Sequence, residues 1–231
     1  MEHELFKPKS FLEGMDSVVG GCNGFSKEQR WAQETPVFAQ AILDNLPAGP
    51  ATLLDYGCGV GRLAKEIIER SEAVTVIGVD ASRAQLAFAR EYVDSDRFTA
   101  LLPHELQTPV DLAYCVYVLQ HVPAIELREI LQRIHHFLKD GGRFVYCSSD
   151  YRMAIRFDET TFLDDRMLGV SLRDEVGRFF TLEGDLFNEE ILDANPLVRT
   201  MVTGDGGRAL AHPALVFTKK TQDRPLFNYG Y

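Results

Sequence analysis

The sequence predicts an α/β protein with a doubly wound, mostly parallel sheet of seven strands and helices on both faces. Three observations predict this fold. Strand-like and helix-like segments alternate over about a hundred residues, which is typical of parallel strands joined by helical crossovers. The strand-like segments are uninterrupted apolar runs, as expected for strands that are covered on both faces. A glycine-rich turn follows the first strand, at residues 57–61.

The first half of the alternation contains two strands and two helices. An apolar run over 51–56 predicts the first strand, and apolar residues at helical spacing predict a helix over 62–70. Residues 73–80 are rich in β-branched side chains and predict the second strand. Ser82 and Gln85 have the spacing of a capping box, which predicts that the second helix begins there.

The second half continues the pattern with three more strands. Residues 98–101 predict a short third strand, and the apolar run 110–117 predicts the fourth. A helical stripe of leucine and isoleucine extends over 127–138, and the Gly141–Gly142 pair is expected to close that helix. Residues 143–147 predict the fifth strand.

The chain is interpreted as one domain whose two ends are less regular than its middle. Residues 1–46 predict an N-terminal helical cap, and 50–150 form the predicted core. Residues 151–195 mix polar and aromatic side chains without a strand pattern, so we interpret them as an insertion or lid after the fifth strand. The last part, 196–220, is expected to hold the final two strands, at Leu197–Thr203 and Ala214–Thr218.

Charge and composition exclude several classes of function. The formal net charge is −10, from 24 basic and 34 acidic residues, so a phosphate backbone would be repelled and nucleic acid is not an expected partner. No apolar stretch is long enough to span a bilayer, and the N-terminus lacks the apolar core of a signal peptide. The four cysteines, at positions 22, 58, 115 and 147, match no zinc pattern. We therefore expect a cytoplasmic protein without a metal site and without a membrane partner.

The glycine-rich turn lies where a doubly wound sheet binds a nucleotide-like ligand. Its glycines stand at 57, 59 and 61, whereas the dinucleotide fingerprint needs its last glycine one position later, where Arg62 stands. Two carboxylates flank the turn. Asp55 would oppose a pyrophosphate but suits a cationic ligand such as S-adenosylmethionine, and Asp80 ends the second strand, where a carboxylate accepts hydrogen bonds from ribose hydroxyls.

Four stretches resemble the motifs of class I S-adenosylmethionine-dependent methyltransferases. They are LLDYGCGVGR at 53–62, VIGVD at 76–80, DLAYCVYVLQHV at 111–122 and LKDGGRFV at 138–145. The resemblance implies the fold of that family and S-adenosylmethionine as cofactor. It also implies that the methionine part is held by Asp55, Gly57 and Gly59 with Cys58 and Gly61 of the same turn, the ribose by Asp80, the adenine near Ala81 and Ser82, and the amino-acid end near Cys115 and Val116.

The family often has an acid after the third strand that binds the adenine amino group. The corresponding stretch here is 101–106, in which Glu105 or a backbone carbonyl is the candidate. Arg30 and Trp31 of the N-terminal helix are candidates for covering the cofactor, although Trp31 is better interpreted as part of the core.

His121 is the candidate general base because it follows the fourth strand and its pKa range suits neutral pH. The alternative is that it caps or packs the next helix. Tyr117 is a candidate for lining the acceptor pocket, although packing in the core is favoured. Residues 150–152 could contact the acceptor or form a solvated loop. The adjacent His135 and His136 do not share a helical face, so a metal pair is not expected.

The leading hypothesis is an enzyme that methylates a small molecule, with the 151–195 segment helping to form the acceptor pocket. Methylation of nucleic-acid amino groups is disfavoured because the fourth strand is not followed by an Asn/Asp-Pro-Pro-Tyr/Phe signature. Alternatives are a cofactor-binding subunit without catalysis, a protein-directed methyltransferase and a nicotinamide-dependent oxidoreductase. The apolar face of the N-terminal helix could pack internally or form a homodimer.

Overall fold

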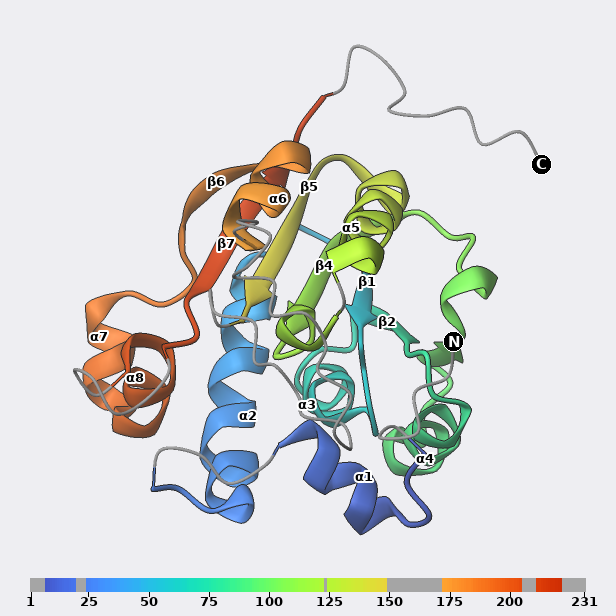
Figure 1. Ribbon diagram of the computed structural model, residues 1–231, viewed down its shortest axis with the longest axis vertical. Coiled ribbons are helices and arrows are strands. Elements are labelled where there is room, and N and C mark those ends of the chain that lie inside the picture. Colours follow the sequence, from blue (N-terminus) through green and yellow to red (C-terminus); the bar gives the residue numbers. More distant parts are fainter. Residues whose placement is uncertain (1–6, 20–23, 123, 149–171, 205–210, 222–231) are drawn as a thin grey trace.

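A seven-stranded sheet forms the centre of the computed structural model, which describes residues 7–19, 24–122, 124–148, 172–204 and 211–221 (Figure 1). The strand order is β3-β2-β1-β4-β5-β7-β6. β7 is antiparallel to both of its neighbours, and the pairs among β1 to β5 are parallel, so the predicted mostly parallel sheet is confirmed. The strands are β1 Ala51–Tyr56, β2 Val74–Val79, β3 Phe98–Leu101, β4 Val110–Val116, β5 Leu138–Cys147, β6 Phe180–Asp185 and β7 Ala214–Lys219.

Helices cover both faces of this sheet, as predicted. α2 and α3 pack with α8 on one face, where they bury one large apolar cluster. α5 and α6 pack on the other face over a second cluster, and a third, small cluster lies beneath α4. The helices are α1 Phe11–Val18, α2 Lys27–Asp44, α3 Arg62–Arg70, α4 Arg83–Val93, α5 Ala124–Phe137, α6 Leu172–Phe179, α7 Glu189–Ala194 and α8 Pro196–Thr203, with short 3₁₀ turns η2 Pro103–Glu105 and η3 Leu119–His121.

The strand order reverses direction between β1 and β4. From β1 the chain proceeds to β2 and β3 on one side, and then returns to β4 and β5 on the other. The carboxyl ends of the strands at such a switch point diverge into a crevice that binds ligands in open α/β sheets. The predicted glycine turn joins β1 to α3 at this point, so the turn lies at the crevice.

Near the C-terminus, one predicted strand is wrong and one strand of the sheet was not predicted. Leu197–Thr203 is not a strand but lies within α8, because Leu197, Val198 and Met201 fall on one buried helical face behind Pro196 at the first helical position. The sixth strand is instead β6, inside the segment interpreted as an insertion. β6 is the last strand of the sheet and is largely exposed, so it lacks the apolar run by which the buried strands were identified.

The double glycine after α5 also differs from its prediction. α5 ends at Phe137 and β5 begins at once, so Gly141 and Gly142 lie inside the strand and do not close the helix. The β4–β5 register shifts at this place. A Cβ atom on Gly142 would lie 2.8 Å from the Lys139 carbonyl oxygen and 2.9 Å from that of Asp111, which explains why glycine is required there.

The three cysteines described by the structure are buried and reduced, and each belongs to a different apolar cluster. Cys147 lies in the α2/α3 cluster, Cys115 in the α5/α6 cluster and Cys58 in the small cluster under α4.

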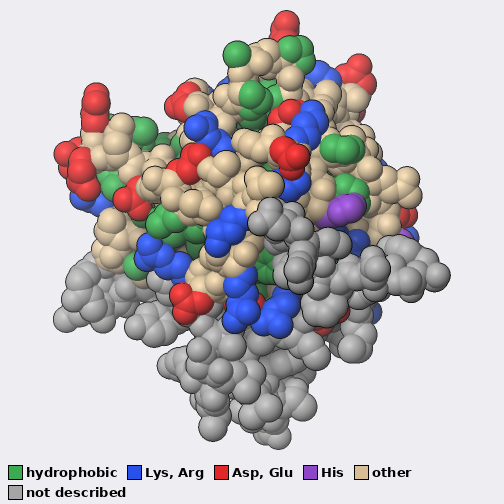
Figure 2. Space-filling view, turned by 90° about the horizontal axis from the view of Figure 1, so that it is seen from above, with side chains coloured by type: hydrophobic (Ala, Val, Ile, Leu, Met, Phe, Trp, Pro, Cys, Tyr) green, Lys and Arg blue, Asp and Glu red, His purple; other side chains and the backbone are tan. Residues whose placement is uncertain are grey.

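No described helix is long and apolar enough to span a membrane. On the face shown in Figure 2, acidic and basic side chains are interspersed.

A buried ion-pair network joins α2 to α3. The fully buried Glu34 carboxylate accepts hydrogen bonds from Arg30 Nε at 3.1 Å and from Arg62 Nη1 at 3.1 Å. Arg62 also donates to the Thr35 hydroxyl at 3.2 Å. Arg62 is the first residue of α3 and follows the glycine turn directly, so this network fixes the end of the turn against the N-terminal helix.

We expect Glu34→Gln to lower the free energy of unfolding by about 3–5 kcal/mol, because two buried guanidinium groups would lose their shared carboxylate. Urea denaturation measures this change. Glu69→Gln is the matched control, since Glu69 is 60% exposed and pairs with Lys65 at 3.7 Å; it should change stability by less than about 1 kcal/mol. Equal effects of the two variants would show that the buried network does not stabilise the fold.

Candidate functional site

The glycine turn has the left-handed backbone conformation that glycine adopts readily. Gly57 and Gly59 have φ values of 81° and 52°, in the left-handed region that favours glycine. A Cβ atom on Gly57 would lie 2.4 Å from the side chain of Val118, and one on Gly59 would lie 2.3 Å from that of Val18. The turn is therefore enclosed between α1 and the loop after β4, and any larger residue at either position would collide with them.

Asp80 stands directly after β2 and faces the turn. One carboxylate oxygen accepts a hydrogen bond from the Gly59 backbone N–H at 3.0 Å, and the other accepts one from the Ser82 N–H at 2.8 Å. Burial raises the pKa of Asp80, although these two hydrogen bonds act in the opposite direction. Each oxygen keeps a further lone pair, so the carboxylate can also accept from two hydroxyl groups of a ligand.

Asp55 lies near the end of β1 and is almost completely buried. Burial raises the pKa of its carboxyl group to about 7, while the side chain of Tyr114 and the positive charge of Arg62 act in the opposite direction. The charge of Asp80 contributes to the rise. A carboxyl group with this pKa favours a cation beside it, because a cation would stabilise its ionised form.

The remaining predicted cofactor residues differ in what they present to the site. Ser82 is the N-cap of α4, as predicted, and its hydroxyl accepts from the Gln85 N–H at 3.2 Å. The predicted capping box is only half formed, because the Ser82 N–H donates to Asp80 and the Gln85 side-chain amide donates to the Ser17 hydroxyl. Ala81 is exposed beside it. The Cys58 and Cys115 side chains point into apolar clusters, and burial raises the pKa of both thiols. Any contact of these cysteines with a ligand would therefore involve the backbone.

The structure brings together Asp55, the turn 57–61, Asp80 and Ser82 at the carboxyl ends of β1 and β2. Val116, half-buried, ends the neighbouring strand β4. Glu105 has another role, since its carboxylate accepts from the Leu102 N–H at 2.7 Å and so caps η2. Trp31 packs against the rings of Phe11 and Tyr92, the latter at a centroid distance of 5.9 Å.

Tyr117 follows β4 with a positive φ of 61°, which is uncommon for a bulky residue. Its N–H donates to the Cys147 carbonyl oxygen at 2.7 Å, and its ring meets the His212 ring edge-on at 5.2 Å. The Arg30 guanidinium lies 5.0 Å from the ring centroid. Burial raises the pKa of the phenol, so it stays neutral at physiological pH.

His121 ends η3 on the same side of the sheet. Burial and the nearby His212 lower its pKa, so the imidazole is neutral at pH 7. Its Nε2 lies 3.2 Å from Gln120 Nε2, and the Gln120 side chain in turn contacts the Ser148 hydroxyl. His121 Nδ1 is buried without a hydrogen-bond partner among the described residues.

Sequence reasoning missed Gln120, Ser148 and His212. Ser148 directly follows a predicted strand and Gln120 directly precedes a candidate base, and both positions could have been noticed. His212 comes from a distant part of the chain, and no local pattern marks it.

Residues 150–152 lie outside the described residues. His135 points a ring nitrogen at the Lys220 carbonyl oxygen at 2.9 Å, and the described residues contain no cluster suited to a metal.

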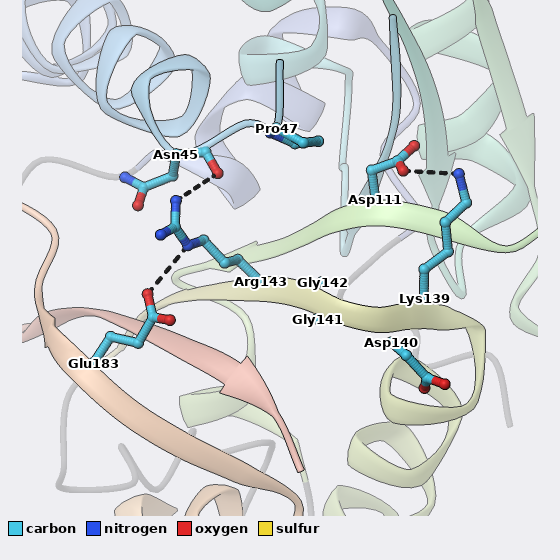
Figure 3. A pocket seen from close by; sticks show the side chains of 9 residues that line it. All are labelled: Asn45, Pro47, Asp111, Lys139, Asp140, Gly141, Gly142, Arg143 and Glu183. Atoms are coloured by element: carbon cyan, nitrogen blue, oxygen red, sulfur yellow. Dashed lines mark hydrogen bonds and ion pairs between the residues drawn. The ribbon is translucent and has the colours of Figure 1, made fainter. Parts of the chain in front are cut away.

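A separate hollow of about 370 Å³ lies at the opposite edge of the sheet (Figure 3). It is formed where β4 and β5 begin, and four of its charged side chains form two ion pairs. Asp111 pairs with Lys139 at 2.7 Å, and Arg143 with Glu183 at 3.1 Å. The hollow therefore has no part in the site at the carboxyl ends.

Comparison with known proteins identifies the domain. The model of a family described as "Methyltransferase domain" matches residues 28–183. A ubiquinone biosynthesis O-methyltransferase of Pseudomonas paraeruginosa is 33% identical over 40% of this chain and 41% of its own length. A trans-aconitate 2-methyltransferase of Variovorax paradoxus is 34% identical over 49% of this chain and 45% of its own length. The match thus spans less than half of either relative.

The fold is also similar to solved structures. A TehB-like S-adenosylmethionine-dependent methyltransferase from Corynebacterium glutamicum superposes with a TM-score of 0.56 at 22% identity. The superposition covers 84% of this chain and 96% of that one. At this identity the likeness concerns the fold.

The raised pKa of Asp55 predicts how stability depends on pH. Between the ordinary value of 3.8 and about 7, the folded chain holds a proton on Asp55 that the unfolded chain has released. Wild-type stability should therefore fall across this range relative to Asp55→Asn, which cannot titrate. Urea midpoints of both proteins from pH 4 to 8 measure the difference. A difference that stays constant with pH would contradict the assigned shift.

Proposed function

The chain belongs to the class I S-adenosylmethionine-dependent methyltransferases, and we propose that it transfers the methyl group of this cofactor to a small-molecule acceptor. The cofactor supplies a methyl group that its sulfonium activates toward in-line displacement. The protein then has to align the acceptor with that methyl group and exclude water.

The residues of the site fit this cofactor. The Asp80 carboxylate has the free lone pairs to bind both ribose hydroxyls, and Ser82 and Ala81 lie beside it for the adenine. Asp55 offers a carboxyl group that a cation would ionise, which suits the ammonium and sulfonium groups. Gly57 and Gly59 allow the backbone to approach the methionine part closely.

The relatives' names support a small-molecule acceptor, since one names ubiquinone biosynthesis and the other trans-aconitate. Tyr117 and His121 follow β4, and His212, which precedes β7, lies near both of them. These three side chains are the proposed lining of the acceptor pocket. A cytoplasmic location, a homodimer and a role for 151–195 in the acceptor pocket stay predictions.

The observation that carries the proposal is the Asp80 carboxylate held by two backbone N–H groups beside the glycine turn. We expect calorimetry to detect binding of S-adenosylmethionine and S-adenosylhomocysteine but not of NAD. Asp80→Ala should weaken the binding of both compounds by at least about 100-fold, because two hydrogen bonds to a charged group are lost.

Asp140→Ala is the matched control, since Asp140 is 93% exposed and lies at the opposite edge of the sheet. This variant should bind S-adenosylmethionine and S-adenosylhomocysteine as tightly as the wild type does. Asp80→Asn serves as a second variant if the alanine variant does not fold. Folded wild-type protein that binds neither compound would refute the proposal.

Binding of the cationic cofactor should release a proton from Asp55 near pH 6, where the carboxyl group is still largely protonated in the free protein. Calorimetry in two buffers of different ionisation enthalpy measures the release. Asp55→Asn should lose it. An equal release from the variant would assign the proton to another group.

A further inference from the structure

A closed chain of hydrogen bonds links η3 to Ser148, the residue that follows β5, and reaches His121. The Gln120 backbone N–H donates to Ser148 Oγ at 3.0 Å, and Ser148 Oγ donates to Gln120 Oε1 at 3.1 Å. The Gln120 side-chain nitrogen lies 3.2 Å from His121 Nε2. Ser148 is completely buried and Gln120 almost so, so bulk water does not compete with these bonds.

The Ser148 hydroxyl determines which way the Gln120 amide points. A hydroxyl carries one proton, and the Gln120 N–H already occupies one of its lone pairs. Within the described chain, the acceptor in reach of that proton is the Gln120 side-chain oxygen. A half-turn of the amide would place its NH₂ group against Ser148 and leave the buried hydroxyl proton unpaired, which is unfavourable. The NH₂ group is therefore directed at His121.

The amide orientation in turn fixes the tautomer of His121. An NH₂ group donates and does not accept, so His121 Nε2 must act as the acceptor. A neutral imidazole has one N–H, which then resides on Nδ1. His121 Nδ1 is buried and has no hydrogen-bond partner among the described residues, so it is a donor that lacks an acceptor.

We propose that Gln120 and Ser148 are positioning residues that hold His121 as an Nδ1–H donor for a carboxylate of the methyl acceptor. This inference rests on the proposed function and replaces the role of general base predicted for His121. The acceptor's carboxylate oxygen forms a bond to the methyl carbon as the methyl–sulfur bond breaks. The electron pair of that bond stays on sulfur, and no proton has to be removed.

The tautomer can be measured without an acceptor. Long-range ¹H–¹⁵N spectra of the uniformly labelled full chain at about pH 8, where neutral rings dominate, distinguish Nδ1–H from Nε2–H histidines. The sequence has six histidines, and the His121 signals are those lost in His121→Asn. We expect the Nδ1–H pattern in the wild type. The Nε2–H pattern would overturn the proposal.

Variants test whether Gln120 and Ser148 cause this tautomer. Gln120→Glu places an acceptor beside His121 Nε2 and should invert the pattern to Nε2–H. Ser148→Ala frees the amide and should give a mixture, whereas Ser148→Thr keeps the hydroxyl and should retain Nδ1–H. An Nδ1–H pattern that persists in both Gln120→Glu and Ser148→Ala would show that Gln120 and Ser148 do not determine the tautomer of His121.

Turnover tests the acceptor class with trans-aconitate as the carboxylate probe, and with a catechol and a primary amine as the other probes. We expect methylation of trans-aconitate alone. With S-adenosylmethionine saturating, so that Asp55 is already ionised, kcat/KM for this acceptor should be independent of pH from 6 to 9. His121→Ala should lower this activity by at least about 10-fold, and His121→Asn, which keeps an N–H near Nδ1, should recover part of that loss. Methylation of the catechol or the amine instead would overturn the carboxylate assignment. Absence of cofactor binding would refute the proposed function and leave the tautomer unaffected.

Discussion

Two backbone N–H groups that bind one carboxylate connect most of the site. Through Asp80, the turn after β1 is tied at Gly59 to the start of α4 at Ser82, and so two neighbouring crossovers of the sheet are held in one arrangement. The parallel register of β1 with β2 brings these segments to the same edge. The conformation of the glycine turn and of the first turn of α4 both depend on this contact, and the proposed binding of ribose would depend on it as well.

The electrostatics of the site follow from burial. Asp55 and Asp80 are close enough for the charge of Asp80 to raise the pKa of Asp55, and burial raises both. Arg62, which belongs to the Arg30–Glu34–Arg62 network, supplies the positive charge that acts on Asp55. Without a ligand, the Asp55 carboxyl group is only partly ionised near neutral pH, and a bound cation would complete its ionisation. For this physical reason a sulfonium cofactor fits the site better than a pyrophosphate.

Sequence patterns predicted the buried half of the fold well and the exposed half poorly. α3 has the predicted bounds, and β1, β2 and β4 lie within a residue of theirs, because strands covered on both faces must be apolar. β6 escaped notice because an edge strand has no such requirement, and α8 was mistaken for a strand because its β-branched residues outweighed its helical face. The pairing of Asp55 with Asp80 was predicted from their spacing along the sequence. The contacts of Gln120 with Ser148 and of Tyr117 with His212 arise only through tertiary folding.

The distribution of cysteines offers an intrinsic set of local probes. Cys147, Cys115 and Cys58 lie in three separate apolar clusters, on the two faces of the sheet and under α4. Each thiol is buried and protonated, so alkylation must wait until its own cluster opens. The order in which these three thiols react with an alkylating reagent would therefore report which layer of the domain opens first, without introducing any label.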